Sequence, residues 1–174
     1  MSSAKTWAAN DVLTASDMNT YVRDGAQMQN VRANNSGAIS VANSSWTLVT
    51  FDSERFDVDS MHNTSSNTGR FVTQRTGVYM FGCCIRWASN ATGYRLLQAR
   101  LNSGGSGSGG TELAQCSNNP LSGTYTQQNL VSLYTFTAGD YVEFFGFQSS
   151  GGALNIEASS NTSPEAWMSF VAKN

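Results

Sequence analysis

The densest group of ionisable side chains lies between Asp52 and Asp59, where four carboxylates fall within eight residues. Carboxylates this close together could hold Ca²⁺. Asp57 and Asp59 would share one face of a strand, but the segment lacks the glycine turn and the terminal glutamate of a calcium-binding loop. We therefore interpret it as solvated loop charge and expect neither a metal ion nor another cofactor.

Hydrolytic chemistry would have to use the single histidine, His62. Asp59, Ser60 and His62 supply the residue types of a catalytic triad. However, no serine lies in the G-x-S-x-G elbow of an esterase, and no pair of carboxylates stands out as a glycosidase site. The sequence therefore predicts a protein that is not an enzyme, and a hydrolase remains the weakest of the functional hypotheses.

Three cysteines, Cys83, Cys84 and Cys116, do not make a disulfide framework. Neighbouring residues on a strand point to opposite faces, so Cys83 and Cys84 should not bridge each other. We interpret all three as small buried apolar residues, with a bridge to Cys116 as the alternative. No C-x-x-C spacing is present and His62 is isolated, so a structural zinc site is not expected.

Aromatic residues could form a surface on which sugar rings stack. On strands, however, such residues usually belong to a core or an interface. If a glycan is bound, the better candidates are the aromatic residues expected in exposed loops. These possible ligand-contacting residues are Tyr94 and Tyr125.

The composition excludes several classes of partner. Charged residues make up 13% of the 174 residues, against roughly 25% in an average soluble domain. The net charge is −2 and there is no long basic run, so we expect no nucleic-acid partner. No apolar stretch approaches the roughly 20 residues of a membrane helix, and the amino terminus does not resemble a signal peptide. We expect synthesis in a cytoplasm, and release by a route such as lysis if the protein leaves the cell.

Residues 1–35 are predicted to form a separate leader that contains one helix. Thr14 can cap this helix, with Asp17 at the third helical position. Apolar residues then recur at steps of three and four as far as Val31, which predicts a helix of about 15–18 residues. A helix with so thin a stripe must pack on the rest of the chain, on sister helices or on a partner. We favour a short three-stranded bundle.

Residues 36–174 are predicted to form one all-β domain, because the pattern changes to period two after the turn at Asn34–Gly37. Ser103–Gly110, which reads SGGSGSGG, is expected to be a mobile loop. Short strands at regular spacing indicate a sandwich or a barrel. The expected strands are Ala38–Ala42, Trp46–Phe51, Arg70–Gln74, Val78–Trp87, Tyr94–Leu101, Glu112–Cys116, Tyr125–Phe136, Tyr141–Gln148 and Ala166–Ala172.

Several of these strands are apolar on both faces, whereas a strand with one solvated face should alternate. Val78–Trp87 and Ala166–Ala172 are examples. One face must be the core, and a subunit interface would cover the other, since a bare patch of this size is unusual on a monomer. Which face is which stays open, and apolar residues tolerated at the surface are the alternative. The predicted interface residues are Val78, Met80, Cys84, Ala166, Met168 and Phe170.

Three segments resemble C1q/TNF-like jelly rolls. Phe71 with Gly77-Val78-Tyr79-Met80-Phe81 resembles their F-x(5)-G-V-Y-x-F signature. Leu133–Glu143 resembles the L-x-x-L-x-x-G-D-x-V segment, and Ala166–Val171 resembles the closing strand, with Ser169 and Phe170 where Gly-Phe is usual. The resemblance runs from about Ala38 to Lys173. It implies a jelly roll of about ten strands in a tight homotrimer, with the inner-sheet strands facing the three-fold axis.

The segment from Thr6 to Asp24 resembles the T-W-x-x-G-[DE]-x-[LV]-T-A-x-x-[LM]-N-x-x-[VL]-R-D leader of tailed-phage structural proteins, with Asn10 in the glycine position. The resemblance implies a virion protein, made in the cytoplasm of a host bacterium, whose leader docks on a capsid or tail protein. The residues that carry it, and that would anchor the chain, are Trp7, Asp11, Leu13, Met18, Asn19, Tyr21, Val22, Arg23 and Asp24.

Taken together, these features predict a homotrimeric phage protein on the virion surface, either a head decoration protein or a head fibre. The alternative is a tail-associated adhesin that binds a glycan or protein of the host surface and so serves host attachment.

Overall fold

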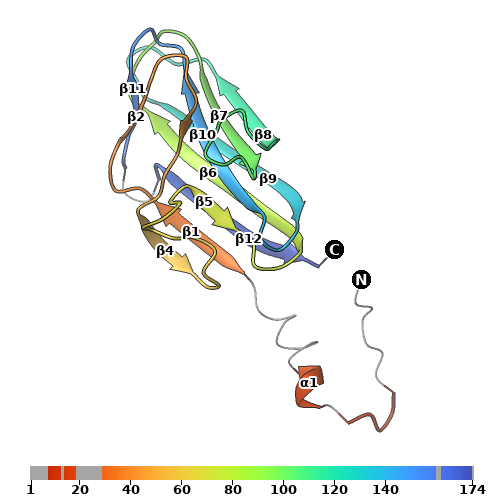
Figure 1. Cartoon of the computed structure of the whole chain (residues 1–174). Helices are drawn as coiled ribbons and strands as arrows, with labels where there is room; N and C mark the ends of the chain where they lie inside the picture. The colour runs from red at the N-terminus through yellow and green to blue at the C-terminus, as the bar shows by residue number, and fades with distance from the viewer. Residues whose placement is uncertain (1–7, 13, 19–28, 160–161, 174) are drawn as a thin grey trace.

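The computed structural model describes residues 8–12, 14–18, 29–159 and 162–173. Two antiparallel sheets pack face to face in an elongated sandwich (Figure 1). The larger sheet has the order β2-β11-β6-β12-β1-β4, with β9 also paired to β6. The smaller sheet has the order β3-β10-β7-β8, with β5 also paired to β10. The predicted all-β jelly-roll class is therefore confirmed.

Each of the nine predicted strands overlaps a strand of the structure, and β10 has the predicted ends. The predicted Trp46–Phe51 was too long, since β3 spans only Thr47–Leu48. Three strands were not predicted: β1, β4 and β11. The strands of the described chain are β1 (Asn30–Asn34), β2 (Ile39–Val41), β3 (Thr47–Leu48), β4 (Ser53–Asp57), β5 (Arg70–Val72), β6 (Gly77–Trp87), β7 (Arg95–Leu101), β8 (Thr111–Asn118), β9 (Thr126–Phe136), β10 (Tyr141–Gln148), β11 (Leu154–Ile156) and β12 (Glu165–Ala172).

The predicted helix was wrong at its carboxyl end, because Val31 lies in strand β1 rather than on a helix. Val31 and Ala33 are buried between the sheets, while Arg32 between them points to the other face. β1 pairs with β12 on one side and β4 on the other. The sandwich therefore includes residues that the sequence pattern assigned to the leader.

The predicted start of the helix is confirmed. Helix α1 is described over Ala15–Asp17. Thr14 Oγ1 accepts a hydrogen bond from Asp17 N–H (3.1 Å), and the Asp17 carboxylate accepts one from Thr14 N–H (3.1 Å). This reciprocal capping box satisfies two N–H groups that the first turn of a helix leaves unpaired. The predicted continuation through residues 19–28 lies outside the described residues.

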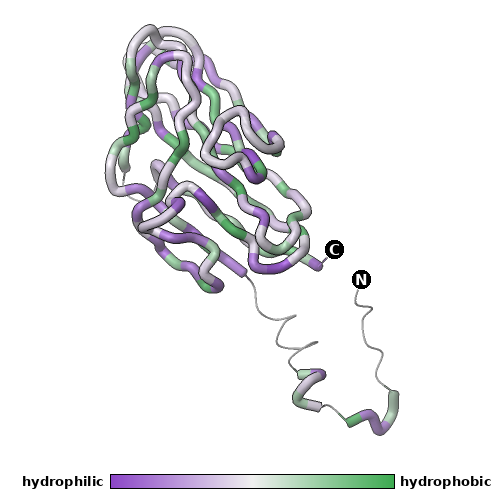
Figure 2. The backbone as a smooth tube through the Cα atoms, viewed as in Figure 1, coloured by the Kyte–Doolittle hydropathy of each residue, from purple (hydrophilic) through white to green (hydrophobic). Residues whose placement is uncertain are grey.

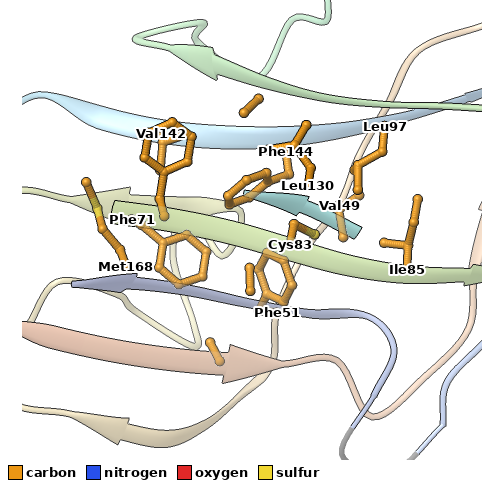
Figure 3. Packing of buried hydrophobic residues seen from close by; sticks show 14 of the residues in the cluster. Val49, Phe51, Phe71, Cys83, Ile85, Leu97, Leu130, Val142, Phe144 and Met168 are labelled. Atoms are coloured by element: carbon orange, nitrogen blue, oxygen red, sulfur yellow. The ribbon is translucent and has the colours of Figure 1, made fainter. Parts of the chain in front are cut away.

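The core lies between the two sheets and combines aliphatic side chains with several aromatic rings in edge contact. Phe71 of β5 contacts Phe51 and Phe144 with ring centroids 5.3 and 6.0 Å apart. Phe81 of β6 contacts Phe136 of β9 at 5.8 Å. Figure 3 shows these layers at close range, with Cys83 and Ile85 on β6 facing Val142 and Phe144 on β10. Figure 2 shows hydrophobic segments along the strands and hydrophilic ones in many of the connections.

Two predicted loops are more ordered than their composition indicated. The acidic segment forms β4, the edge strand of the larger sheet, instead of a solvated loop. Ser103–Gly110 is held against the smaller sheet: Ser103 is buried, and the Arg100 side chain donates to the carbonyl of Gly109. The expectation of a mobile loop overlooked these contacts, which a glycine-rich composition does not reveal.

Candidate self-association surface

The outer face of the larger sheet carries a row of residues that crosses five strands and that is apolar except for Arg32. Strand pairing places Phe56 of β4, Arg32 of β1, Trp167 of β12, Gly82 of β6 and Val131 of β9 opposite one another in that order. Side chains opposite each other on one face of a sheet are in contact range. The row therefore forms a continuous band on the side of the sheet that faces away from the core.

Gly82 explains how the large Trp167 side chain lies flat on this band. A Cβ atom at position 82 would stand 2.7 Å from Cζ2 of Trp167 and 2.8 Å from the carbonyl oxygen of Leu130. No side chain fits in that space. The indole thus covers β6 where the glycine leaves the backbone bare, and it reaches toward β9.

The next row extends the apolar band. Met80 of β6 lies opposite Leu133 of β9. The exposed fractions are 38% for Met80, 58% for Leu133 and 61% for Val131. Isolated exposed apolar residues are normal, but a contiguous group on a sheet face marks an interaction site.

Three of the predicted interface residues do lie on this outer face. Val78 and Cys84 are partly buried there, and Met80 is exposed. The opposite face of β6 is the core, because Tyr79, Phe81 and the following alternate residues are buried. Participation of Val78, Met80 and Cys84 in an interface stays a prediction.

The other three predicted interface residues lie on the wrong face for that role. Ala166 and Met168 are buried in the core, and Phe170 packs against it with its ring 5.2 Å from that of Tyr79. Met168 pairs with Phe81, which faces the core. The residues of β12 that point outward are instead Glu165, Trp167 and Ser169, and sequence reasoning missed them.

A groove of about 490 Å³ opens on the same face, beside Trp167. An ion-pair network between the buried Glu165 and two partly exposed arginines closes one side of it. The Glu165 carboxylate lies 2.6 Å from Arg32 Nε and 3.0 Å from Arg55 Nε. Arg55 occupies a β-bulge between β1 and β4, which brings it to the carboxylate. The hydrogen bond to Glu165 raises the pKa of Arg32.

The three cysteines have thiols of low reactivity, and only Cys84 lies on this face. Cys84 lines the groove and its sulfur accepts a hydrogen bond from Gln127. Burial raises the pKa of Cys84 and of Cys116, and raises that of Cys83 far more. All three cysteines are unbridged; Cys83 is buried as predicted, whereas Cys84 and Cys116 are only partly buried. A raised pKa lowers the thiolate fraction, so none is an activated nucleophile.

The residues considered for hydrolysis do not assemble into a triad. His62 Nδ1 lies 2.8 Å from Glu54 Oε1, and its Nε2 lies 3.0 Å from the carbonyl oxygen of Thr68. Neither partner is the hydroxyl of Ser60. The Asp59 carboxylate accepts from Gln29 instead of orienting the ring. The histidine ties two segments of backbone together.

In the segment considered for Ca²⁺, the Asp57 carboxylate binds backbone N–H groups. Both oxygens of Asp57 accept backbone N–H groups, from Met61 and His62, each at 2.9 Å. In the described residues, no three His, Cys, Asp or Glu side chains gather closely enough to hold a metal ion. Within the same residues, no helix combines the length and the hydropathy that a membrane span requires.

The two tyrosines predicted to contact a ligand are exposed but lie in different environments. Tyr94 stacks on Phe147 of β10 with ring centroids 5.7 Å apart. Tyr125 lies under the guanidinium of Arg86 at 5.1 Å. Both keep about half of their surface open, and their role in ligand binding stays a prediction.

Of the predicted anchoring residues, the structure describes only Asp11 and Met18. The Asp11 carboxylate accepts from Ala8 N–H at 2.9 Å, and Met18 is exposed. The remaining seven lie outside the described residues: Trp7, Leu13, Asn19, Tyr21, Val22, Arg23 and Asp24.

The sandwich is similar to solved jelly rolls of one class. Eiger TNF from S. frugiperda is 16% identical, covers 84% of this chain and 93% of its own, and has a TM-score of 0.58. The globular domain of zebrafish complement 1qA is 14% identical, covers 84% and 98%, and has a TM-score of 0.54. The fold is a TNF/C1q-like jelly roll.

Murine APRIL at pH 5.0 has the same fold, with 10% identity, coverage of 83% and 100%, and a TM-score of 0.62. At these identities the likeness concerns the fold alone. No family model and no curated protein matches the sequence.

Proposed function

We propose that this chain is a non-enzymatic structural protein that forms a homotrimer through the outer face of the larger sheet. The apolar band from Phe56 to Val131 is the observation that carries the proposal. At roughly 25 cal/mol per Å² of apolar surface, covering such a band with a second copy gives a favourable free energy of association. The resemblance of the sequence to C1q/TNF-like chains supports a closed ring of three.

A ring of three is also consistent with the shape of the surface. A ring contact joins two different patches of the same chain, unlike a two-fold dimer in which one patch meets itself. The band ends at β9, which lies beside β6 in the larger sheet and has exposed apolar residues on it. In the proposed assembly, the β9 end of the band of one copy, with Val131 and Leu133, lies against the rest of the band on the next copy.

We further propose that the trimer belongs to a bacteriophage virion and docks on it through residues 6–24. The support is the leader pattern in the sequence, from Trp7 to Asp24, together with the capping box at Thr14 and Asp17. Three leaders joined in one trimer would bind a particle by avidity, so each contact can be weak. A capsid protein is the proposed partner, and the jelly roll would then face outward as a head decoration or head fibre.

The test of the assembly is a mass measurement by light scattering coupled to gel filtration. We expect three times the mass of one chain across a broad range of concentration. A stable monomer would overturn the homotrimer.

The test of the location is electron cryo-microscopy of phage particles labelled with an antibody against residues 36–174. Label on the head supports decoration, and label on the tail would replace it with the adhesin. A second version of the protein that lacks residues 1–24 should remain trimeric but fail to bind purified particles. Undiminished binding of that version would contradict the role of the leader.

A further inference from the structure

A second groove, of about 510 Å³, lies on the outer side of the smaller sheet. Its floor includes Arg70 and Val72 of β5 and Tyr141 of β10. Its wall is the loop from Ser60 to Asn67 that follows β4. A volume of this size suits a small ligand of one or two rings, since such sites span roughly 300–1,000 Å³.

The loop that forms the wall is held in place before any ligand arrives. The buried His62 ring links it to Glu54 at one nitrogen and to the carbonyl of Thr68 at the other. Phe51 N–H also donates to the Thr68 carbonyl, at 2.9 Å. A preformed wall removes much of the ordering cost of binding. This gives the single histidine a structural role in shaping the groove.

Two residues of the loop adopt a conformation that side chains rarely take. Ser60 has a φ of 54° and Asn67 a φ of 51°, both in the left-handed region. For Ser60 this conformation costs roughly 1–2 kcal/mol, whereas asparagine adopts it more readily. Strain of this kind persists only where the surroundings impose it, and it is concentrated at functional sites.

Two amide side chains of the groove, Asn63 and Gln74, each use one of their two polar atoms in a hydrogen bond within the chain. Asn63 Oδ1 accepts from Ser65 N–H (2.8 Å) and Ser66 N–H (2.9 Å), which leaves its NH₂ group as a donor. Gln74 Nε2 donates to the Ser60 carbonyl at 3.0 Å, which leaves its oxygen as an acceptor. Both side chains line the same groove, and a donor and an acceptor together match a hydroxyl group, which both donates and accepts.

The charges in the groove are compensated. The Arg70 guanidinium is bonded through Nε to Glu143 at 2.9 Å and lies 4.4 Å from the centre of the Tyr141 ring. The His62 ring is hydrogen-bonded to Glu54. The rest of the lining is mainly hydroxyl and amide groups, with the apolar side chains of Met61 and Val72. The groove therefore offers polar, uncharged recognition beside a flat stacked pair.

From these features we propose that the groove binds a neutral saccharide of one or two rings, with Asn63 and Gln74 bonding its hydroxyl groups. The site lies across the sandwich from the apolar band. Arg70 and Val72 flank the core residue Phe71 and point away from the larger sheet. The groove thus stays open whether or not the chain self-associates, and it is independent of the proposed homotrimer.

The test is a titration of the full ¹⁵N-labelled chain with glucose, galactose and N-acetylglucosamine. We expect saturable changes in the amide signals of Asn63, Asn67 and Gln74 with at least one sugar, at a dissociation constant on the order of 1 mM. Glucuronic acid is titrated in parallel as the charged comparison. Absence of any saturable change with the three neutral sugars up to about 50 mM, or saturation only by glucuronic acid, would overturn the proposal.

Two variants locate the site. Asn63→Asp keeps the oxygen that bonds Ser65 and Ser66 but removes the donor, and Gln74→Ala removes the acceptor. Each should raise the dissociation constant by roughly fivefold to tenfold, as expected for one hydrogen bond. The matched controls, Asn155→Asp on β11 and Gln115→Ala on β8, alter exposed residues outside the groove and should leave it unchanged. Wild-type affinity in both groove variants would contradict the assignment.

Discussion

The outer faces of the two sheets both hold a buried glutamate, yet they are completed in different ways. On the smaller sheet, Glu143 is held by Arg70 and by the loop of the same chain, through Ser103 and Gly105 N–H. On the larger sheet, Glu165 is held by Arg32 and Arg55, and the apolar residues beside it remain exposed.

The difference lies in what covers the apolar residues of each outer face. The chain itself covers the aromatic residues of β10 that point outward. Phe145 is buried, and Trp46 contacts Phe147 with the ring centroids 5.1 Å apart. A Cβ at Gly107 of the loop would meet Trp46 at 2.3 Å, so the loop lies directly on it. The larger sheet has no comparable cover among the described residues, so we assign its covering to another copy.

The largest expected effect is on assembly. Val131→Lys combined with Leu133→Lys places two charges in the proposed interface. We expect dissociation to folded monomers, with the association constant lowered at least about 100-fold, because burying unpaired charges costs several kcal/mol. Light scattering measures the mass and circular dichroism the fold. The control, Thr111→Lys on exposed β8, should keep the assembly; an unchanged mass in the double variant would contradict the interface.

The next largest effect is expected from removing each of the two buried glutamates, which should change the free energy of unfolding in different ways. Glu143→Ala leaves Arg70 without its carboxylate and frees the loop, so we expect a loss of about 3 kcal/mol in the free energy of unfolding. This loss should not depend on protein concentration. Glu165→Ala should also destabilise the fold, but its loss should grow at concentrations where the wild type assembles. Urea denaturation at two protein concentrations measures both losses. If the two variants showed the same dependence on protein concentration, the distinction between the two faces would be contradicted.

Gly82→Ala tests the packing of Trp167 on the open face. The new methyl group would strike the indole and the Leu130 carbonyl, so we expect a loss of roughly 1–3 kcal/mol, as for other overpacked sites. Gly152→Ala is the control, because a Cβ there meets no atom within 4 Å. Denaturant unfolding compares them, and equal stability of both variants would show that the indole can move aside.

Alkylation of the cysteines should give the smallest effect. Burial raises the pKa of all three thiols, so labelling at pH 8 should be slower than for a free cysteine and should speed up as pH rises. Cys83 should react last. We expect Cys84 to react severalfold faster in the Val131→Lys, Leu133→Lys monomer than in the assembly, with Cys116 as internal reference. Mass spectrometry of iodoacetamide-treated protein measures the rates, and equal Cys84 rates would place it outside the interface.

The sequence by itself determined the strands that carry strong local signals. Turn residues and period-two patterns located nine strands, and the Thr14–Asp17 spacing located the capping box. β1 was missed because Val31 continues the helical spacing of the preceding residues, and local spacing carries no information about the distant strands β12 and β4 that pair with it. The saccharide groove was missed because Asn63, Arg70 and Tyr141 come together only through the fold.

Only the tertiary structure decided which face of a two-faced strand is the core. β6 and β12 are apolar on both sides, and a period of two says that alternate residues share a face without saying which face is inside. The pairing of Met168 with Phe81 turns Ala166 and Met168 inward and Trp167 outward. The sequence therefore indicated that a second surface needed cover, while the register of two strands distant in sequence determined which residues form it.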